Sequence, residues 1–315
     1  MPVKFSIFLP TGFGRELAHI PDPVDAFETV SQVARAGDRL GYETLWIVDH
    51  LHTIPPSQAT FFECWTTLAA LARDTERIRI GQMVTGNNYR NPALQAKMAS
   101  TVDVLSHGRF TFGIGAGWYE SDYHAYGYEY SEAPERLRQL REAVQIILSL
   151  WTEDETTIEG KYYQINGAIN QPKGVQRPHV PMLIGGAGEK VTLKLVAQYG
   201  DVCNVIESPA GLAHKYGVLK RHCDDAGRNY DSILRTTTSI CVMADTDEEA
   251  RALVPGGTEA IYPGDVGEYG LIGSIDTIHR RIADYEAAGV QEIAISFLES
   301  TDPDVLKRFA EEFIH

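Results

Sequence analysis

Short apolar runs alternate with longer amphipathic stretches along almost the whole chain. Between residues 23 and 40, apolar side chains recur at helical spacing, with Pro23 suited to a first helical turn and Gly41 suited to a helix end. Residues 44–48 form a continuous apolar run, which is typical of a strand buried on both faces in a parallel sheet. The pattern therefore predicts a unit of one strand and one helix that repeats.

The repeats predict eight strands separated by helices. The expected strands are residues 3–9, 44–48, 78–84, 109–114, 181–184, 201–206, 234–243 and 292–297. The expected helices are residues 23–40, 63–73, 92–105, 134–151, 189–199, 209–226, 274–288 and 303–314, with a further helix starting at Asp247. Eight such units without a break in composition predict an α/β fold, a single closed (β/α)8 TIM barrel domain over residues 1–315. An open, doubly wound sheet is the alternative.

Two segments exceed the needs of a minimal barrel. Residues 152–180 are expected to form an insertion at the barrel rim, with a hairpin over 156–164 and Gly160 in its turn. Residues 255–273 hold six glycines and two prolines, so they are expected to form a loop. Neither segment interrupts the alternation of strands and helices.

Composition and charge limit the kinds of molecule that the protein is expected to bind. No run approaches 18 apolar residues and the N-terminus lacks the features of an export signal, so a cytoplasmic protein without a membrane span is expected. The formal net charge of 28 − 43 = −15 disfavours nucleic acid as a partner and leaves a small-molecule substrate, anionic ones included. The four cysteines form no CxxC pair and are expected to be reduced and mostly buried.

In a barrel, the loops after the C-terminal strand ends build the active site. Asp49 and His50 are an adjacent acid–histidine pair directly after the second expected strand. A histidine there either gives or takes a proton at a bound ligand, which makes His50 the candidate catalytic residue, or merely hydrogen-bonds its neighbours. Asp49, His50 and His52 have the wrong spacing for a known metal-ligand motif, so no metal is expected.

A second candidate is the glycine loop Gly185-Gly186-Ala187-Gly188, between an apolar strand and an expected helix. Glycines let backbone N–H groups approach a phosphate, and a helix N-terminus attracts one. The alternative is an ordinary glycine-rich turn without a ligand. The segment matches neither a P-loop nor the six-residue dinucleotide fingerprint, and the chain has no GxSxG motif.

Aromatic residues crowd the stretch from Trp118 to Tyr130. Such a cluster either forms a wall for a flat heterocyclic ligand or serves as loop packing or a subunit contact. The residues expected to line an apolar or aromatic substrate pocket are Phe13, Phe61, Trp65, Trp118 and Tyr119.

Taken together, these motifs resemble the bacterial luciferase-like superfamily, and within it the coenzyme F420-dependent oxidoreductases. The resemblance extends from Val3 to the final helix. Its motifs are Asp49-His50, Gly81–Thr85, Asn91-Pro92, Leu105–Arg109, Gly113–Trp118 and Gly185-Gly186. The segments Leu105–Arg109 and Gly113–Trp118 are specific to the superfamily, but they distinguish F420 from FMN less well.

The resemblance implies a (β/α)8 barrel, often dimeric, so a homodimer is expected. It implies coenzyme F420 at the C-terminal mouth, with FMN as the alternative. It also implies a non-proline cis peptide at Met83–Val84 behind the deazaflavin ring, Asp49 and His50 beside that ring, and Gly185 and Gly186 near the cofactor phosphate. The full set of implied cofactor-binding residues is Asp49, His50, Met83, Val84, Thr85, Gly117, Trp118, Gly185, Gly186, Ala187 and Gly188.

Three functions remain open: an F420-dependent oxidoreductase, an FMN-dependent monooxygenase, and a noncatalytic cofactor-binding protein on the same barrel. The F420-dependent sugar-phosphate dehydrogenases of the family carry a proton-donating glutamate after the fourth strand, where this chain has Trp118. Oxidation of glucose 6-phosphate is therefore not expected, and nearby Glu120 is not assigned that role.

Overall fold

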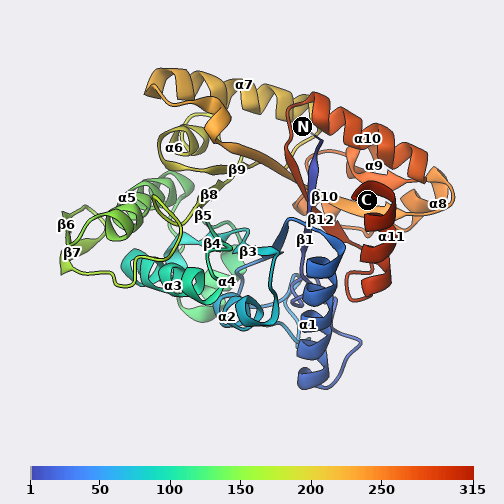
Figure 1. Ribbon diagram of the computed structural model, residues 1–315, viewed down its shortest axis with the longest axis horizontal. Coiled ribbons are helices and arrows are strands. Elements are labelled where there is room, and N and C mark those ends of the chain that lie inside the picture. The colour runs from blue at the N-terminus through green and yellow to red at the C-terminus, as the bar shows by residue number, and fades with distance from the viewer. Residues whose placement is uncertain (1) are drawn as a thin grey trace. The chain divides into compact units, whose positions relative to one another are not determined.

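The computed structural model describes residues 2–315 and is built around eight parallel strands (Figure 1). These are β1 (Lys4–Phe8), β2 (Thr44–Ile47), β3 (Arg79–Gln82), β5 (Phe110–Gly115), β8 (Met182–Gly185), β9 (Val202–Asn204), β10 (Leu234–Met243) and β12 (Glu292–Phe297). Their pairing order is β12-β1-β2-β3-β5-β8-β9-β10, and β10 pairs with β12, so the order closes on itself. This is the order of a (β/α)8 barrel, which confirms the predicted fold class.

Helices connect the successive strands, as expected from the amphipathic stretches. The longer ones are α1 (Pro23–Leu40), α2 (Cys64–Asp74), α3 (Pro92–Leu105), α5 (Ala133–Thr152), α6 (Thr192–Tyr199), α7 (Pro209–Ala226), α10 (Ile275–Ala287) and α11 (Pro303–Phe313). The short ones are α4 (Glu120–Tyr126), α8 (Asp247–Ala252) and α9 (Val266–Tyr269), with 3₁₀ turns η1 (Asn87–Tyr89), η2 (Tyr230–Ser232) and η3 (Thr258–Ala260). Within residues 2–315, no helix is both long and apolar enough to cross a membrane.

The chain forms two compact units. One comprises the residues up to Leu9 together with Gln32–Trp46 and Gly186–His315. The other comprises Pro10–Ser31 and Ile47–Gly185. We refer to these as the terminal unit and the central unit.

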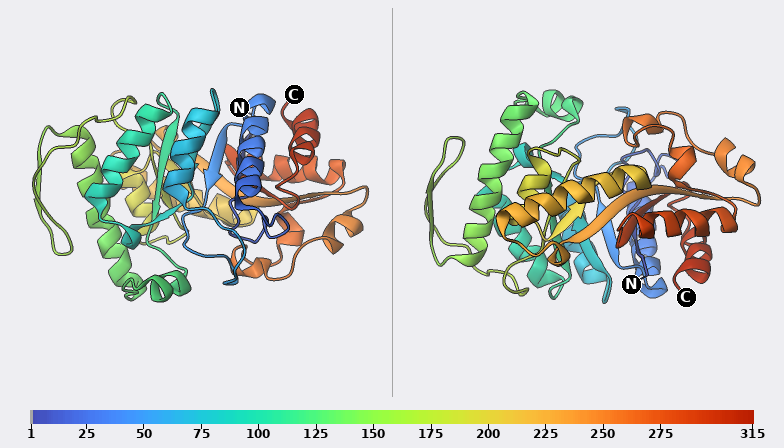
Figure 2. Two further views of the ribbon diagram at one scale, coloured as in Figure 1. Left: turned by 90° about the horizontal axis from the view of Figure 1, so that it is seen from below. Right: turned by 90° about the horizontal axis from the view of Figure 1, so that it is seen from above.

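An aromatic cluster fills the core of the terminal unit. The ring of Phe309 on α11 lies 5.1 Å from that of Phe5 on β1 and 5.4 Å from that of Phe297 on β12. The buried Tyr42 stacks on the same ring and donates its hydroxyl to the Leu306 carbonyl at 2.9 Å. These contacts attach α11, the red helix that ends at the C-terminus in Figure 2, to its strands.

The core of the central unit is also aromatic. Trp151 at the end of α5 meets Phe112 on β5 edge to face at 5.4 Å, and its indole N–H donates to the Ala96 carbonyl of α3 at 3.0 Å. Trp65 on α2 contacts Phe110 and Phe112. Helices α2, α3 and α5 are thereby fixed against the strands whose C-terminal ends carry the candidate site.

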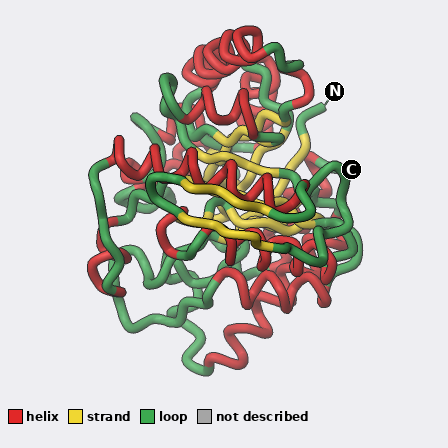
Figure 3. The backbone as a smooth tube through the Cα atoms, turned by 90° about the vertical axis from the view of Figure 1, so that its left-hand side faces the viewer, coloured by secondary structure: helices red, strands yellow, loops and turns green. Residues whose placement is uncertain are grey.

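Within the expected insertion at residues 152–180, β6 (Thr156–Glu159) and β7 (Gln164–Ala168) form an antiparallel hairpin, visible as the two yellow strands nearest the viewer in Figure 3. One carboxylate secures its turn, since Glu142 on α5 accepts the backbone N–H groups of Lys161, Tyr162 and Tyr163 at 2.7 to 3.0 Å.

The structure differs from the sequence-based expectation in four places. The expected loop at residues 255–273 contains α9 and a short strand, β11 (Leu271–Gly273), which pairs in parallel with β10. Helix α4 was not predicted. Helix α6 begins at Thr192 rather than at Glu189, whose carboxylate pairs with Lys215 and His214 on α7. β4 (Thr85–Gly86) continues the third strand after a break.

Candidate active site

The candidate site lies in the central unit, where segments following β2, β3 and β5 converge. Asp49 and His50 follow β2, Tyr89 and Arg90 follow β4, and Asp122 lies on α4 after β5. Because these strands are parallel, their C-terminal ends lie at the same edge of the sheet. Short loops therefore bring polar side chains from three positions in the sequence together.

The centre of this polar group is Asp122, which is fully buried. Its Oδ2 lies 2.7 Å from His50 Nδ1 and accepts the Tyr89 hydroxyl at 2.9 Å. Its Oδ1 lies 2.8 Å from His52 Nδ1, at an angle that falls short of a hydrogen bond. One carboxylate is therefore shared by two histidines and a tyrosine.

These contacts determine the charge of Asp122. Burial by itself raises the pKa of a carboxyl group, because it disfavours the charged form. The hydrogen bond and charge of His50, the Tyr89 hydroxyl and the charge of His52 outweigh burial and lower the pKa of Asp122 below its usual value. Asp122 is therefore an ionised hydrogen-bond acceptor at neutral pH.

His50 occupies an aromatic setting. Its ring stacks on Phe13 with centroids 4.2 Å apart and planes at 11°, and Trp118 and Tyr119 approach it edge to face at 5.7 Å and 5.6 Å. The residue is only 9% exposed. Its Nδ1 is occupied by Asp122, whereas its Nε2 makes no hydrogen bond to any residue between 2 and 315. That nitrogen is the atom left for a ligand.

Asp49 is committed to a different network. Arg90 clamps its carboxylate with two nitrogens, at 2.6 Å and 3.2 Å, and the Thr85 hydroxyl also donates to it. Arg90 reaches on to Glu63 at 2.7 Å. Burial raises the pKa of Asp49, and the Arg90 charge opposes this by favouring the carboxylate. Asp49 and Thr85 thus use their side chains to hold the strand ends together.

The peptide Met83–Val84 is cis, as the resemblance implied. The Val84 side chain occupies space that glycines leave open on the neighbouring strands. A Cβ at Gly115 would lie 2.8 Å from Val84 Cγ2, and one at Gly185 would lie 2.9 Å from Val84 Cγ1. Gly185 is thus required here for close approach to Val84.

Gly117 and Trp118 form the turn between β5 and α4. Gly117 has φ of +78°, and a Cβ on it would lie 1.8 Å from the Tyr123 hydroxyl oxygen. The buried Arg136 donates to the Gly117 carbonyl at 3.3 Å, and Tyr130 donates to the Trp118 carbonyl at 3.0 Å. The hydrogen bonds to these two carbonyls therefore hold the turn in place. The indole of Trp118 remains 50% exposed.

The rest of the glycine loop belongs to the terminal unit. Gly186, Ala187 and Gly188 are exposed, and Gly186 has φ of +128°. The Gly186 N–H already donates to the Asn204 carbonyl at 3.3 Å. The Thr192 side chain, at the start of α6, lies close to Gly186 and Gly188. Of this loop, the N–H groups of Ala187 and Gly188 are the ones without a backbone partner among the bonds of residues 2–315.

Comparison with known proteins identifies the family. The family model for luciferase-like monooxygenases matches residues 3–292. The chain belongs to this family.

Curated relatives of this luciferase-like chain include users of two cofactors. An F420-dependent glucose-6-phosphate dehydrogenase of Amycolatopsis mediterranei is 32% identical over 55% of this chain and 51% of that protein. An FMNH(2)-dependent dimethylsulfone monooxygenase of Pseudomonas putida is 27% identical over 61% of this chain and 52% of that protein. The luciferase-like chain spans about half the length of these two relatives.

A solved structure supports the architecture. An F420-dependent secondary alcohol dehydrogenase in complex with an F420-acetone adduct matches with a TM-score of 0.81, over 100% of this chain and 97% of that one, at 20% identity. At this identity the likeness shows that the luciferase-like chain shares the fold.

The site of this luciferase-like chain fits a flat heterocyclic cofactor. The indole of Trp118 is half exposed. Beside it, His50 Nε2 makes no hydrogen bond to residues 2–315, so it can donate one to a ligand or accept one from it. The half-buried Met83 and Val84 add apolar surface at the end of β3. Among residues 2–315, no group of three or more His, Cys, Asp or Glu side chains is arranged to hold a metal ion.

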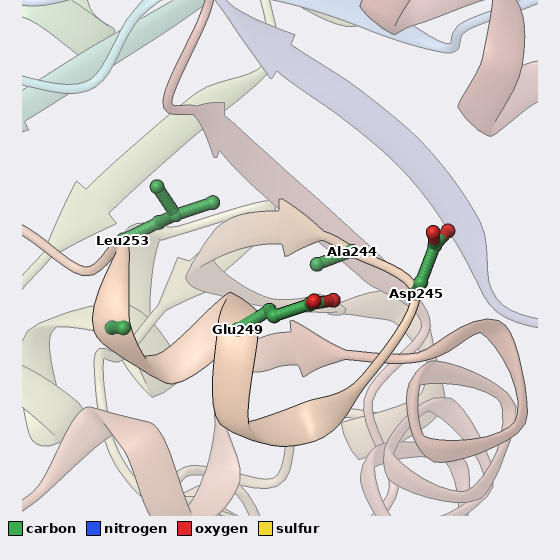
Figure 4. A pocket seen from close by; sticks show the side chains of 5 residues that line it. Ala244, Asp245, Glu249 and Leu253 are labelled. Atoms are coloured by element: carbon green, nitrogen blue, oxygen red, sulfur yellow. The ribbon is translucent and has the colours of Figure 1, made fainter.

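A separate hollow of about 530 Å³ lies in the terminal unit, along α8 and the end of β10 (Figure 4). It is lined by Ala244, Asp245, Glu249, Ala252 and Leu253. The Glu249 carboxylate accepts the Thr246 N–H in a capping box that starts α8. The Glu249 carboxylate thus serves the helix, and none of the site residues predicted from the sequence lines this hollow.

Sequence reasoning named Asp49 and His50 but missed their partners: Asp122 beside His50, Tyr89 on Asp122, and Arg90 on Asp49. Asp122 lies in a stretch that was interpreted only as aromatic, and Tyr89 and Arg90 lie in a loop whose residues carry no motif. The available signal was position, since all three follow the ends of barrel strands. An acidic residue on a strand-end loop opposite a histidine is a candidate partner for it.

Proposed function

We propose that this luciferase-like protein is an F420-dependent oxidoreductase that transfers a hydride between coenzyme F420 and a small organic substrate. The observation that carries the proposal is His50, whose Nδ1 faces the Asp122 carboxylate and whose Nε2 has no partner within an aromatic setting. Relatives at 32% and 34% identity are F420-dependent glucose-6-phosphate dehydrogenases, which supports F420 as the cofactor.

Each unit offers groups suited to a part of this cofactor. In the central unit, Trp118 and the Met83–Val84 strand end are suited to its ring, and in the terminal unit the N–H groups of Ala187 and Gly188 are suited to a phosphate. When bound, coenzyme F420 supplies the hydride chemistry. His50 holds or moves a proton at Nε2 beside the reacting atoms, while the surrounding rings of Phe13 and Tyr119 exclude water.

The substrate is proposed only as a class. Where the sugar-phosphate dehydrogenases of the family carry a glutamate, this chain carries Trp118, an apolar and half-exposed side chain. An apolar or aromatic substrate suits such a wall better than a sugar phosphate, whose charge needs cationic partners. The proposed reaction is therefore oxidation or reduction of a small, mainly apolar organic compound.

Two measurements test this function. Purified protein is titrated with F420 and with FMN by fluorescence, and the protein carrying each reduced or oxidised cofactor is then given a panel of apolar alcohols, ketones and enones. We expect F420 to bind more tightly and to change its redox state with at least one compound. Absence of turnover with both cofactors would instead support a noncatalytic cofactor-binding protein.

An FMN-dependent monooxygenase is the second candidate. It is favoured by the Pseudomonas putida relative, which is named as FMNH(2)-dependent and matches 61% of this chain. The same aromatic setting and glycine loop would serve a flavin. Tighter binding of FMN, together with oxygen consumption by the protein carrying reduced FMN, would establish this function in place of the first.

A further inference from the structure

The two histidines of the site share one carboxylate, and this arrangement has a chemical consequence. His50 Nδ1 and His52 Nδ1 lie 2.7 Å and 2.8 Å from opposite oxygens of Asp122. An ionised carboxylate can only accept hydrogen bonds. Each imidazole therefore lowers its energy by placing a proton on Nδ1, the nitrogen that faces Asp122: His50 through a hydrogen bond, and His52 through electrostatic attraction to the carboxylate at 2.8 Å.

We infer that Asp122 is a positioning residue that holds His50 and His52 in the Nδ1–H form and so presents the Nε2 lone pair of His50 to the substrate. In a neutral imidazole, a proton on one nitrogen leaves the other as an acceptor. In water a neutral histidine ring usually carries its proton on Nε2 instead. Without Asp122, the neutral His50 ring would mostly carry its proton on Nε2, the nitrogen that faces the ligand. In that form Nε2 could not accept a proton.

The contacts of His52 agree with this assignment. Its Nε2 lies 3.2 Å from the Ser121 hydroxyl, which can donate a hydrogen bond to a lone pair on that nitrogen. A proton on Nδ1 is then the arrangement that suits both neighbours at once. The Tyr89 hydroxyl is a second hydrogen-bond donor to Asp122 Oδ2, beside His50.

The setting also fixes the orientation of the rings. Asp122 is fully buried on α4, and the His50 ring is confined between Phe13 and the edges of Trp118 and Tyr119. A side chain that is confined by packing and by one short hydrogen bond loses little further freedom when it reacts. Asp122 thus acts through His50 rather than on the substrate.

The test uses Asp122→Asn, which keeps the size of the side chain and removes its charge. ¹⁵N NMR of histidine side chains, recorded on the cofactor-free protein at alkaline pH, reports which nitrogen carries the proton. We expect His50 and His52 to be in the Nδ1–H form in the native protein and to shift toward the Nε2–H form in the variant. This readout does not depend on the identity of the cofactor, so it succeeds or fails independently of the proposed function.

The kinetic part rests on the proposed function. In the protein loaded with F420, Asp122→Asn is expected to lower kcat between about 10-fold and 10⁴-fold, with a much smaller change in cofactor affinity. His124→Ala is the matched control, because His124 lies on the same helix, is exposed and contacts Glu120 at 3.7 Å and the Tyr130 ring at 6.3 Å but not Asp122.

Tyr89→Phe keeps the experiment informative if Asp122→Asn fails to fold. This variant removes one donor from Asp122 but leaves the charge that sets the histidine protons, so the Nδ1–H forms should persist. An Nε2–H form of His50 in the native protein would overturn the inference, whatever the variants do. So would an Asp122→Asn protein that folds and retains its native histidine protons.

Discussion

At the site, single side chains differ in how far the sequence alone reveals their roles. His50 is evident because it follows a strand end beside an acid, and Asp49 is evident for the same reason. In the structure the Asp49 carboxylate accepts hydrogen bonds from Arg90 and Thr85. The partner of His50 is Asp122 instead, 72 residues further along the chain. A pairing across such a separation depends on β2, β3 and β5 lying side by side in the sheet, so the local sequence pattern does not reveal it.

His50 provides the first prediction. His50→Ala should lower turnover by about 10²-fold to 10⁴-fold, because it removes the group proposed to hold the proton at the reacting atoms. Cofactor affinity should change far less, since the aromatic face of Trp118 is retained. Stopped-flow measurement of F420 oxidation or reduction, together with a fluorescence titration, separates the two effects. Unchanged turnover with an identified substrate would make His50 a structural residue.

Gly117 provides the second prediction, on stability. Gly117→Ala places a Cβ at φ of +78° and 1.8 Å from the Tyr123 hydroxyl oxygen, so it incurs both backbone strain and a clash. Gly127→Ala is the matched control, because φ there is +74° with nothing within 4 Å of the added Cβ. We expect the control to cost about 1–2 kcal/mol in the free energy of unfolding and Gly117→Ala to cost about 1–3 kcal/mol more.

Urea denaturation measures both variants. The double variant Gly117→Ala, Tyr123→Phe removes the hydroxyl that the new methyl group meets, so it should recover part of the extra loss. Equal destabilisation of the two alanine variants would show that the Tyr123 side chain moves away from the new methyl group at no cost in free energy. Only the backbone conformation would then matter at Gly117.

Elements were predicted well where burial is complete and poorly where it is partial. The eight barrel strands consist of residues that are mostly buried, and some of them, such as β2 and β8, are nearly continuous apolar runs. Helix α4 was missed because most of its seven residues are polar or aromatic and several are exposed. β11 was missed because it is three residues long and lies within a glycine-rich segment.

The junction of α8 and α10 gives a pH-dependent prediction at this scale. The Asp247 carboxylate of α8 accepts the N–H of Ser274 at 2.8 Å and the hydroxyls of Ser274 and Thr277 at 2.9 Å and 2.7 Å. These bonds favour the charged form and lower the pKa of Asp247 to about 2, from 3.8. A lowered pKa in the folded state means that the charged group stabilises the fold above the unfolded-state value.

Asp247→Asn should therefore destabilise the protein at neutral pH, and its difference from the native protein should shrink as the pH falls from about 4 to about 2. Urea unfolding at pH 7, 4, 3 and 2 measures that difference. Asp276→Asn is the control, because Asp276 is exposed on the same α10 and makes no side-chain contact within the described residues. A difference that stays constant down to pH 2 would contradict the assigned role of the Asp247 charge.

For the whole molecule, the sequence predicted the barrel and the family, and it left the cofactor open. Ring contacts and a glycine loop serve F420 and FMN alike, since both have a tricyclic ring and a phosphate. What distinguishes them is the lactyl and oligoglutamate tail of F420, which is anionic. A chain with a formal net charge of −15 repels such a tail at long range, so binding F420 requires local cations.

Lys190 and Lys194, exposed beside the glycine loop and on α6, are the cations suited to that tail. Arg177 is less suited, because its guanidinium donates to the Gly174 and Gln176 carbonyls at 3.1 Å and 2.9 Å. We therefore expect F420 to bind more tightly than FMN, and its affinity to fall more steeply between about 50 mM and 500 mM salt, because salt screens exposed charges. Calorimetry at the two salt concentrations measures both affinities.

Replacing Lys190 and Lys194 by Ala should remove most of the extra salt dependence, whereas Lys220→Ala should not, because Lys220 pairs with Asp224 on α7. Tighter binding of FMN at both salt concentrations would instead favour the FMN-dependent monooxygenase.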